Sequence, residues 1–164
     1  MSYVRIWIHG VFATKHREPL LTDAVRPALC EHILLNARKK QLFLDCVNGY
    51  HEHLHCLFQL PGARDVGETI QLLKGESSFW MNHEQNPSQR FAWQDDYFAV
   101  SVSESQVETV RRYIHRQEDH HRSHSFEEEA EAFGRKFGWD RGYFLGRRGP
   151  SAKANGKTGK PLRG

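Results

Sequence analysis

Apolar and polar positions along the chain follow two periods, one of two residues and one of about 3.6 residues. The first period, with many aromatic and β-branched residues, predicts strands at residues 3–14, 42–48, 53–60 and 91–103. The second predicts helices at residues 22–40, 66–83, 106–121 and 126–137. The order, β-α-β-β-α-β with C-terminal helices, is that of an α+β, ferredoxin-like (RRM-like) palm. Because this fold performs many unrelated functions, particular side chains must carry the functional argument.

The basic residues are unevenly distributed and divide the chain near residue 145. Residues 146–164 hold six of the 23 Lys and Arg residues, several Gly, and no Asp or Glu. Because this segment is too polar to build a core, we expect a flexible basic tail. Residues 1–145 form the predicted single domain and carry the other 17 basic residues against all 20 acidic ones, a net charge of −3. A nucleic-acid contact within this domain must therefore be a local patch.

Composition excludes several classes of protein. The longest apolar runs are much shorter than the roughly 18 residues of a membrane-spanning helix, and the first residues lack the layout of a signal peptide. The three cysteines, Cys30, Cys46 and Cys56, form no CxxC pair and are odd in number. We therefore expect small buried thiols in a cytoplasmic protein that has no membrane partner.

Seven of the eleven histidines lie in two short windows, residues 51–55 and 115–124. Strand alternation places His51, His53 and His55 on one face and leaves Leu54 for the core. We prefer His53 and His55 as a metal-binding pair, because pairing His51 with His53 would direct Glu52 at the core. Two imidazoles coordinate a divalent metal incompletely, so surface or core roles for these histidines stay open at this point.

The second window places a tyrosine and an amide on one helix face. Tyr113, Gln117 and His121 are spaced i, i+4 and i+8. A tyrosine next to an apolar stripe usually packs against the core, and such a stripe is formed here by Val107, Val110 and Ile114. However, the amide oxygen of Gln117 suits Mg²⁺ or Mn²⁺ and would complete a His/His/Gln ligand set. Tyr113 would then lie one turn from the metal.

These side chains together suit an attack on a phosphodiester. A bound cation polarises a phosphate and stabilises the charge that develops on it. A phenol, with a pKa near 10, becomes a nucleophile when it is deprotonated, and its phosphodiester keeps the bond energy for rejoining. The expected products of cleavage are a 5′-phosphotyrosine and a free 3′-hydroxyl.

An ordered set of motifs extends from residue 3 to about residue 137. It comprises His9-Gly10-Val11-Phe12-Ala13-Thr14-Lys15 with Arg17 and Pro19, Glu52-His53-Leu54-His55, Leu73-Lys74-Gly75-Glu76-Ser77-Ser78, Trp93-Gln94-Asp95-Asp96-Tyr97, Ser101-Val102-Ser103, Tyr113 to His121, and Ser125-Phe126. The set resembles the single-tyrosine HUH transposases of small insertion sequences, the IS200-like transposases. The closest branch is the REP-associated tyrosine transposases. The HxH motif alone is unspecific, whereas the ordered set is specific.

The resemblance implies an enzyme that cleaves and rejoins single-stranded DNA at hairpin, REP-like elements. It implies Tyr113 as the nucleophile and His53, His55 and Gln117 as ligands of Mg²⁺ or Mn²⁺. It further implies a nucleoid-associated homodimer, and the tyrosine helix serves either its own active site or that of the partner. Mobility of the element is not implied, because relatives in this branch are often single-copy housekeeping genes.

Further candidate residues surround this set. We expect His9 and His121 to contact the metal ligands and orient them, without binding the metal themselves. The family-like placement of Lys15, Arg17 and Lys74 predicts contacts with DNA phosphates, although solvated surface roles are the alternative. His51 and the long basic tail depart from the family pattern.

Two other functions fit part of the sequence. A histidine-triad nucleotide hydrolase also uses alternating histidines, but Glu52 breaks the apolar alternation, and such an enzyme gives Tyr113 no role. A domesticated, non-catalytic nucleic-acid-binding module would use aromatic residues as stacking platforms and would keep the basic tail. Covalent trapping of DNA discriminates, because only the transposase forms an adduct that resists denaturation.

Overall fold

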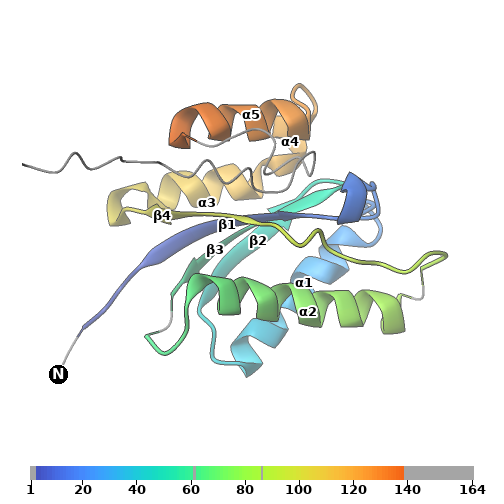
Figure 1. The fold of residues 1–164 in the computed structure, drawn as a ribbon, viewed down its shortest axis with the longest axis horizontal. Helices are drawn as coiled ribbons and strands as arrows, with labels where there is room; N and C mark the ends of the chain where they lie inside the picture. The colour runs from blue at the N-terminus through green and yellow to red at the C-terminus, as the bar shows by residue number, and fades with distance from the viewer. Residues whose placement is uncertain (1–2, 61, 86, 139–164) are drawn as a thin grey trace, which may run out of the picture.

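A four-stranded antiparallel sheet forms the centre of the computed structural model, which describes residues 3–60, 62–85 and 87–138 (Figure 1). Its strands, in the spatial order β2-β3-β1-β4, are β2 (Leu44–Gly49), β3 (His53–Gln59), β1 (Trp7–Ala13) and β4 (Phe98–Val102). The central neighbours β1 and β3 pair from Trp7 with Gln59 to Ala13 with His53. The predicted ferredoxin-like arrangement is confirmed.

Helices α1 (Arg26–Lys39) and α2 (Val66–Glu84) cover one face of the sheet (Figure 1). A capping box between Asp65 and Glu68 fixes the start of α2, where two backbone amides would otherwise lack acceptors. The main core lies between these helices and the sheet and includes Ile8, Phe12, Leu54, Phe58, Ile70 and Leu73. Close packing requires Gly10 in β1, because a Cβ atom there would lie 2.8 Å from Cδ1 of Ile70.

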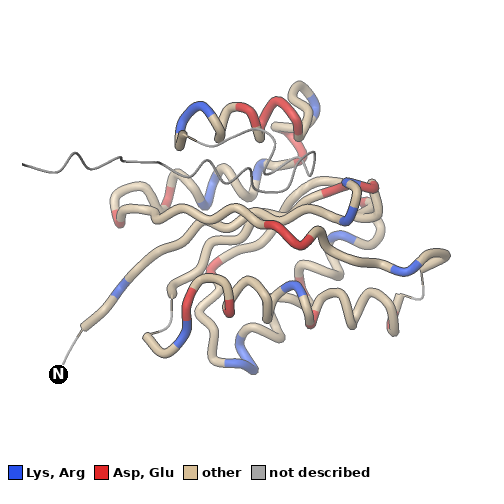
Figure 2. The backbone as a smooth tube through the Cα atoms, in the orientation of Figure 1, with Lys and Arg blue, Asp and Glu red and all other residues tan. Residues whose placement is uncertain are grey.

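The other face carries α3 (Val107–His115), α4 (Gln117–His121) and α5 (Phe126–Phe137), with two short 3₁₀ turns, η1 (Lys15–Arg17) and η2 (Glu104–Gln106), in the connections. Smaller core clusters join Val107 and Ile114 of α3, and Phe126 and Ala130 of α5, to the sheet. Acidic residues occupy the first turn of α5 and basic residues its last turn, which complements the helix dipole (Figure 2). The sheet is thus buried on both faces.

Several predicted boundaries are wrong. β1 begins at Trp7 rather than at residue 3. The first helix begins at Arg26 rather than after Thr22, because a start at Thr22 would place Pro27, which lacks an amide hydrogen, in the helix interior. The strand predicted at 91–103 contains β4 and one isolated bridge, Thr14 with Trp93. Asp95 and Asp96, which lie between the bridge at Trp93 and the start of β4, disfavour strand structure in that segment.

The helix predicted at 106–121 is divided at Arg116. The amide of Arg116 is shared between the carbonyls of Arg112 and Tyr113, at 3.1 and 3.2 Å, which tightens the turn. The apolar stripe that seats α3 on the sheet ends at Ile114, so the chain beyond it is no longer held along the same axis.

The remaining predictions concern cysteines, membrane spans and the tail. Cys30, Cys46 and Cys56 are free, buried thiols, as expected. Within residues 3–60, 62–85 and 87–138, no helix has both the length and the apolar character needed to cross a membrane. The basic tail predicted at 146–164 lies outside the described residues.

Candidate active site

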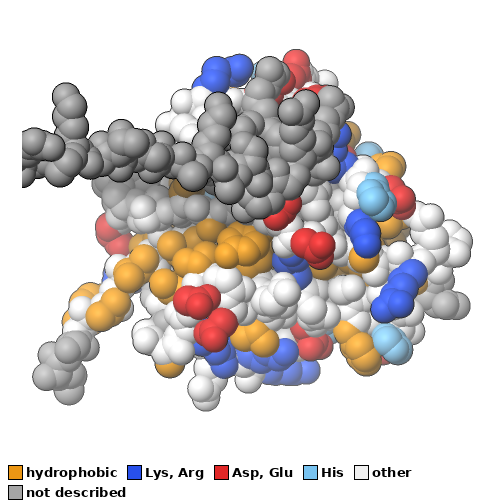
Figure 3. All heavy atoms as spheres, in the orientation of Figure 1, with side chains coloured by type: hydrophobic (Ala, Val, Ile, Leu, Met, Phe, Trp, Pro, Cys, Tyr) orange, Lys and Arg blue, Asp and Glu red, His pale blue; other side chains and the backbone are white. Residues whose placement is uncertain are grey.

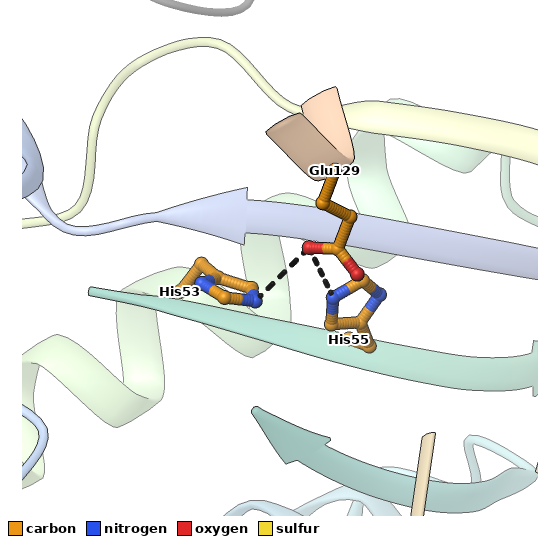
Figure 4. Close-up of side chains that lie close together, drawn as sticks. All are labelled: His53, His55 and Glu129. Atoms are coloured by element: carbon orange, nitrogen blue, oxygen red, sulfur yellow. Dashed lines mark ion pairs between the residues drawn. The ribbon is translucent and has the colours of Figure 1, made fainter. Parts of the chain in front are cut away.

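The histidine pair lies at the start of the central strand β3. The side chains of His53 and His55 are fully buried and face the layer formed by α3, α4 and α5 (Figure 4). The expectation that His51 shares this face is wrong, because β3 begins at His53 and His51 lies in the preceding bend. The imidazole of His51 instead contacts Asp23, with 3.3 Å between Nε2 and Oδ1. The structure therefore separates His51 from the other two histidines.

Helices α3 and α4 bring the tyrosine face to this pair. Oε1 of Gln117 lies 3.3 Å from Nε2 of His53, and Gln117 is fully buried. Nε2 of His121 lies 3.2 Å from the same nitrogen, so His121 is a direct member of the cluster rather than a residue behind it. The Tyr113 ring packs edge-on against His55, with 5.6 Å between ring centroids.

Glu129 of α5 occupies the centre of the cluster, a position that the sequence analysis missed. Its Oε2 lies 3.4 Å from Nε2 of both His53 and His55 and 3.5 Å from Nε2 of His121 (Figure 4). Its Oε1 accepts a hydrogen bond from the hydroxyl of Tyr113 and another, at 3.4 Å, from the amide of Gln117. This carboxylate thus contacts the candidate nucleophile, the candidate amide ligand and three of the histidines.

The sequence does contain a pattern that indicates a buried role for Glu129. In the run Glu127-Glu128-Glu129, only the last residue shares the helix face of Phe126, Ala130 and Phe133, which are spaced i, i+4 and i+7. A carboxylate on an apolar face must be paired when it is buried. In the structure Glu129 is 4% exposed.

Hydrogen bonds on the far side of two imidazoles fix which nitrogen faces the cluster. Nδ1 of His121 lies 2.8 Å from the carbonyl oxygen of His124, which can only accept, so Nδ1 carries the hydrogen. Nδ1 of His53 faces the carboxylate of Glu52 at 3.3 Å in the same way. The two Nε2 atoms therefore present lone pairs to each other when the rings are neutral.

His55 receives similar support from β1. Its Nδ1 lies 3.0 Å from Nε2 of His9, as expected for a residue that orients a ligand. Among the described residues, neither Nε2 of His55 nor Oε2 of Glu129 has a hydrogen-bond partner. Buried polar atoms without partners are rare and call for an explanation.

A divalent cation fits these atoms. Nitrogen and oxygen ligands lie about 2.0–2.2 Å from such an ion, which separates neighbouring ligand atoms by about 3.0–3.5 Å. The 3.4 Å contacts of Oε2 of Glu129 with Nε2 of His53 and His55 match this spacing, and the ligand atoms of these three residues all lie within 4.8 Å of one another. A cation would also remove the repulsion between facing lone pairs and satisfy the two atoms that lack partners.

Burial sets the charge states of the cluster. It lowers the pKa of His55 well below its usual value, with the neighbouring His53 adding to the effect. Burial and His53 lower the pKa of His121 to about 4, and burial and His55 lower the pKa of His9 to about 3. These imidazoles are neutral at pH 7, the form that binds metals. Burial raises the pKa of Glu129 to about 7.

The three residues expected to contact DNA do not share one environment. Lys15 is exposed and Arg17 partly exposed in η1, directly after β1. Lys74 is buried and lies on α2. This helix covers the face of the sheet that is opposite to the histidine cluster. The ammonium of Lys74 donates a 2.8 Å hydrogen bond to the carbonyl of Asp95, and burial lowers its pKa.

Comparisons with known proteins identify the family of the chain. The family model described as "Transposase IS200 like" matches residues 2–117, a range that includes His53, His55, Tyr113 and Gln117 and ends before Glu129. Among curated proteins, none matches. A crystal structure of a candidate transposase from Deinococcus radiodurans R1 is 24% identical, with a TM-score of 0.58, and the alignment covers 71% of this chain and 95% of that one.

A second solved structure, a REP-associated tyrosine transposase bound to a REP hairpin, is 20% identical over 70% of this chain and 66% of that one, with a TM-score of 0.45. The first structural likeness supports the fold, and the family match extends over more than half of the sequence. The chain belongs to the IS200-like transposase family.

Proposed function

We propose that this transposase cleaves and rejoins single-stranded DNA at hairpin, REP-like elements through a 5′-phosphotyrosine at Tyr113. The single observation that supports the proposal most strongly is the convergence around Glu129. The hydroxyl of Tyr113, the amide Nε2 of Gln117 and Nε2 of His53 and His55 all contact the carboxylate of Glu129. A nucleophile next to a metal-ligand set is what phosphodiester cleavage requires.

The candidate ligands are His53, His55 and Gln117, with Glu129 completing the donor set. Mg²⁺ or Mn²⁺ held there would polarise the scissile phosphate and stabilise the charge that develops on it. His9 and Glu52 orient the imidazoles, because each contacts the ring nitrogen that faces away from the cluster.

The chain's own residues perform the proton and bond changes. The Tyr113 oxygen forms a bond to phosphorus, and the bond from phosphorus to the 3′ oxygen breaks. Oε1 of Glu129 accepts the phenol proton, since it already accepts the hydrogen bond from that hydroxyl. The 3′ oxygen takes up one proton from water and leaves as a 3′-hydroxyl, and rejoining reverses these changes.

The domain and assembly are part of the same proposal. Residues 1–145 form the catalytic domain, and 146–164 form a basic arm that adds sequence-independent phosphate contacts. Truncation after residue 145 should keep cleavage and give binding with a shallower salt dependence. We also propose a homodimer on the family resemblance. Light scattering measures the oligomer independently of activity.

Covalent trapping tests the function. The full chain is incubated with Mn²⁺ and labelled hairpin oligonucleotides that copy inverted repeats near the gene, and a denaturing gel separates any adduct. We expect an adduct with the wild-type chain and none with Tyr113→Phe, which should bind the hairpin within a few-fold of the wild type. An adduct formed equally by Tyr113→Phe would remove Tyr113 as the nucleophile. Hairpin binding without any adduct would favour the non-catalytic binding module.

A further inference from the structure

A cavity of about 740 Å³ adjoins the candidate nucleophile. It lies between β4, α3 and α5, and Tyr113 and Glu129 are part of its lining. Val100 and Val102 of β4 line the cavity. On the face shown in Figure 3, hydrophobic side chains gather in a band at the level of this strand. The volume is in the range of sites that bind small organic molecules, about 300–1,000 Å³.

Aromatic rings form one wall of the cavity. Phe133 of α5 lies 6.4 Å from the Tyr113 ring and 6.0 Å from the His9 ring, measured between centroids. Phe137, one helical turn further on, is 39% exposed and lies 6.2 Å from Phe133. Phe133 is partly buried and stacks on Phe98, with 5.1 Å between centroids, whereas the exposed ring of Phe137 offers a flat surface on which another ring can stack.

Polar groups occupy the rim. Ser101 of β4 and Thr109 of α3 line the cavity and can donate or accept hydrogen bonds. Lys136 also lines it and supplies a positive charge near Phe137, 5.2 Å from that ring. Apolar flat walls with a few polar groups suit a planar heteroaromatic ring better than an aliphatic chain.

We propose that this cavity binds an unpaired nucleobase next to the scissile phosphate of the single-stranded substrate. The inference rests on the proposed function, because that function places a phosphate at the Tyr113 hydroxyl, and the flanking nucleosides must then lie beside it. The base stacks on Phe137 and packs against Phe133, and Lys136 faces the backbone. Stacking on aromatic side chains is a general way of holding single-stranded nucleic acid.

Two carboxylates also line the cavity, and both are engaged. Oε2 of Glu128 accepts a 2.7 Å hydrogen bond from the amide of Ser125 in the capping box. Glu129 contacts Tyr113 and the imidazoles. Neither carboxylate lies free at the aromatic wall, so their charge does not oppose a neutral base stacked there.

The test compares two probes that differ only in their bases: a twelve-nucleotide thymidine strand, and a strand of equal length and charge in which every nucleotide is abasic. Binding is measured by fluorescence anisotropy at one salt concentration. The variants are Phe137→Ala and Phe133→Leu, of which the second keeps apolar packing on the sheet. Phe79→Ala is the matched control, because Phe79 is 59% exposed on α2, on the opposite face of the sheet.

We expect Phe137→Ala and Phe133→Leu to weaken binding of the thymidine strand by about 5- to 100-fold, and to leave binding of the abasic strand unchanged. Phe79→Ala should change neither. Equal weakening of both probes, or no weakening by either variant, would overturn the cavity as a base site while the proposed function stands. If the wild-type chain binds neither probe and forms no hairpin adduct, the proposed function itself fails.

Photo-crosslinking locates the base directly. A thymidine strand that carries one 5-iodouracil is irradiated with the wild-type chain, and the modified peptide is identified by mass spectrometry. Modification within the α5 peptide that contains Phe133 and Phe137 supports the proposal. Modification confined to peptides on the opposite face of the sheet, such as that of Phe79, would contradict it.

Discussion

The hydroxyl of Tyr113 on α3 donates a hydrogen bond to Oε1 of Glu129 on α5, sixteen residues later in the chain. The other oxygen of this carboxylate faces Nε2 of His53 and His55. One side chain therefore joins the candidate nucleophile to the candidate metal ligands, and α5 is part of the site rather than an appendage.

Replacing Glu129 with Gln should weaken metal binding, because the donor set loses its one negative charge while its size is kept. We expect the Mn²⁺ dissociation constant, measured by calorimetry, to rise on the order of tenfold or more, and covalent adduct formation with hairpin DNA to slow. Glu128→Gln is the matched control, since Gln preserves a capping box. Wild-type Mn²⁺ affinity in Glu129→Gln would remove this carboxylate from the ligand set.

Mn²⁺ should stabilise the folded chain, because the ion binds native but not unfolded protein. At 100 times its dissociation constant the expected gain in the free energy of unfolding is about 2.7 kcal/mol. His53→Ala and His55→Ala should abolish the metal-dependent rise in melting temperature, and His51→Ala should keep it, because His51 points to Asp23. A chelator serves as the reversal control. Equal losses in all three variants would contradict the assignment of the pair.

Stability of the metal-free chain should fall on acidification. His9, His55 and His121 have pKa values lowered by burial, so below pH 6.5 the unfolded chain takes up protons that the native chain does not. Glu129 acts in the opposite direction: its raised pKa, about 7, contributes stability that is present below about pH 4.5 and is lost as pH rises through 7.

The three imidazoles change the free energy of unfolding more than the one carboxylate does. Between pH 7 and pH 5 we expect a loss on the order of 1–3 kcal/mol in the free energy of unfolding, measured by urea denaturation. Saturating Mn²⁺ at pH 7 provides the comparison, because bound metal excludes protons from the same nitrogens. A stability that is constant or rises toward pH 5 would show that these histidines are not held neutral.

Two glycines should respond oppositely to alanine. A Cβ atom at Gly49 would overlap the backbone carbonyl of His53, so Gly49→Ala must displace the start of β3 and should cost about 1–3 kcal/mol of stability. Gly75 lies within α2 with nothing within 4 Å of its Cβ position, so Gly75→Ala should add about 0.5–1 kcal/mol. Chemical denaturation measures both. A neutral Gly49→Ala would mean that the β2–β3 connection tolerates a shift.

Phosphate contacts should be detectable in the salt dependence of binding. Lys15 and Arg17 lie in η1 with exposed or partly exposed side chains. Each alanine variant should reduce the slope of log affinity against log salt for single-stranded DNA by about 0.7. Lys74→Ala should leave the slope unchanged and lower stability instead, because its ammonium is held by the Asp95 carbonyl. An unchanged slope for Lys15 and Arg17 would place the DNA elsewhere.

Local patterns in the sequence determined much of this protein. Helical periodicity predicted α2 and α5 to within a residue, and in the structure both helices begin at a capping box. Strand alternation with an apolar Leu54 selected His53 and His55, and the i, i+4 spacing placed Tyr113 and Gln117 on one face. These features depend on neighbours within a few residues, which a single sequence displays.

Contacts between distant segments were decided only by the tertiary structure. Glu129 reaches the cluster because Phe126 and Ala130 pack on Val11 and Phe98, and this packing fixes the position of α5. His121 joins the cluster because the chain turns at Arg116, and Lys74 is buried because the segment that contains Asp95 lies over its ammonium. A side chain's role at this site follows from which atoms surround it, and that is set by packing across the sheet rather than by spacing along the chain.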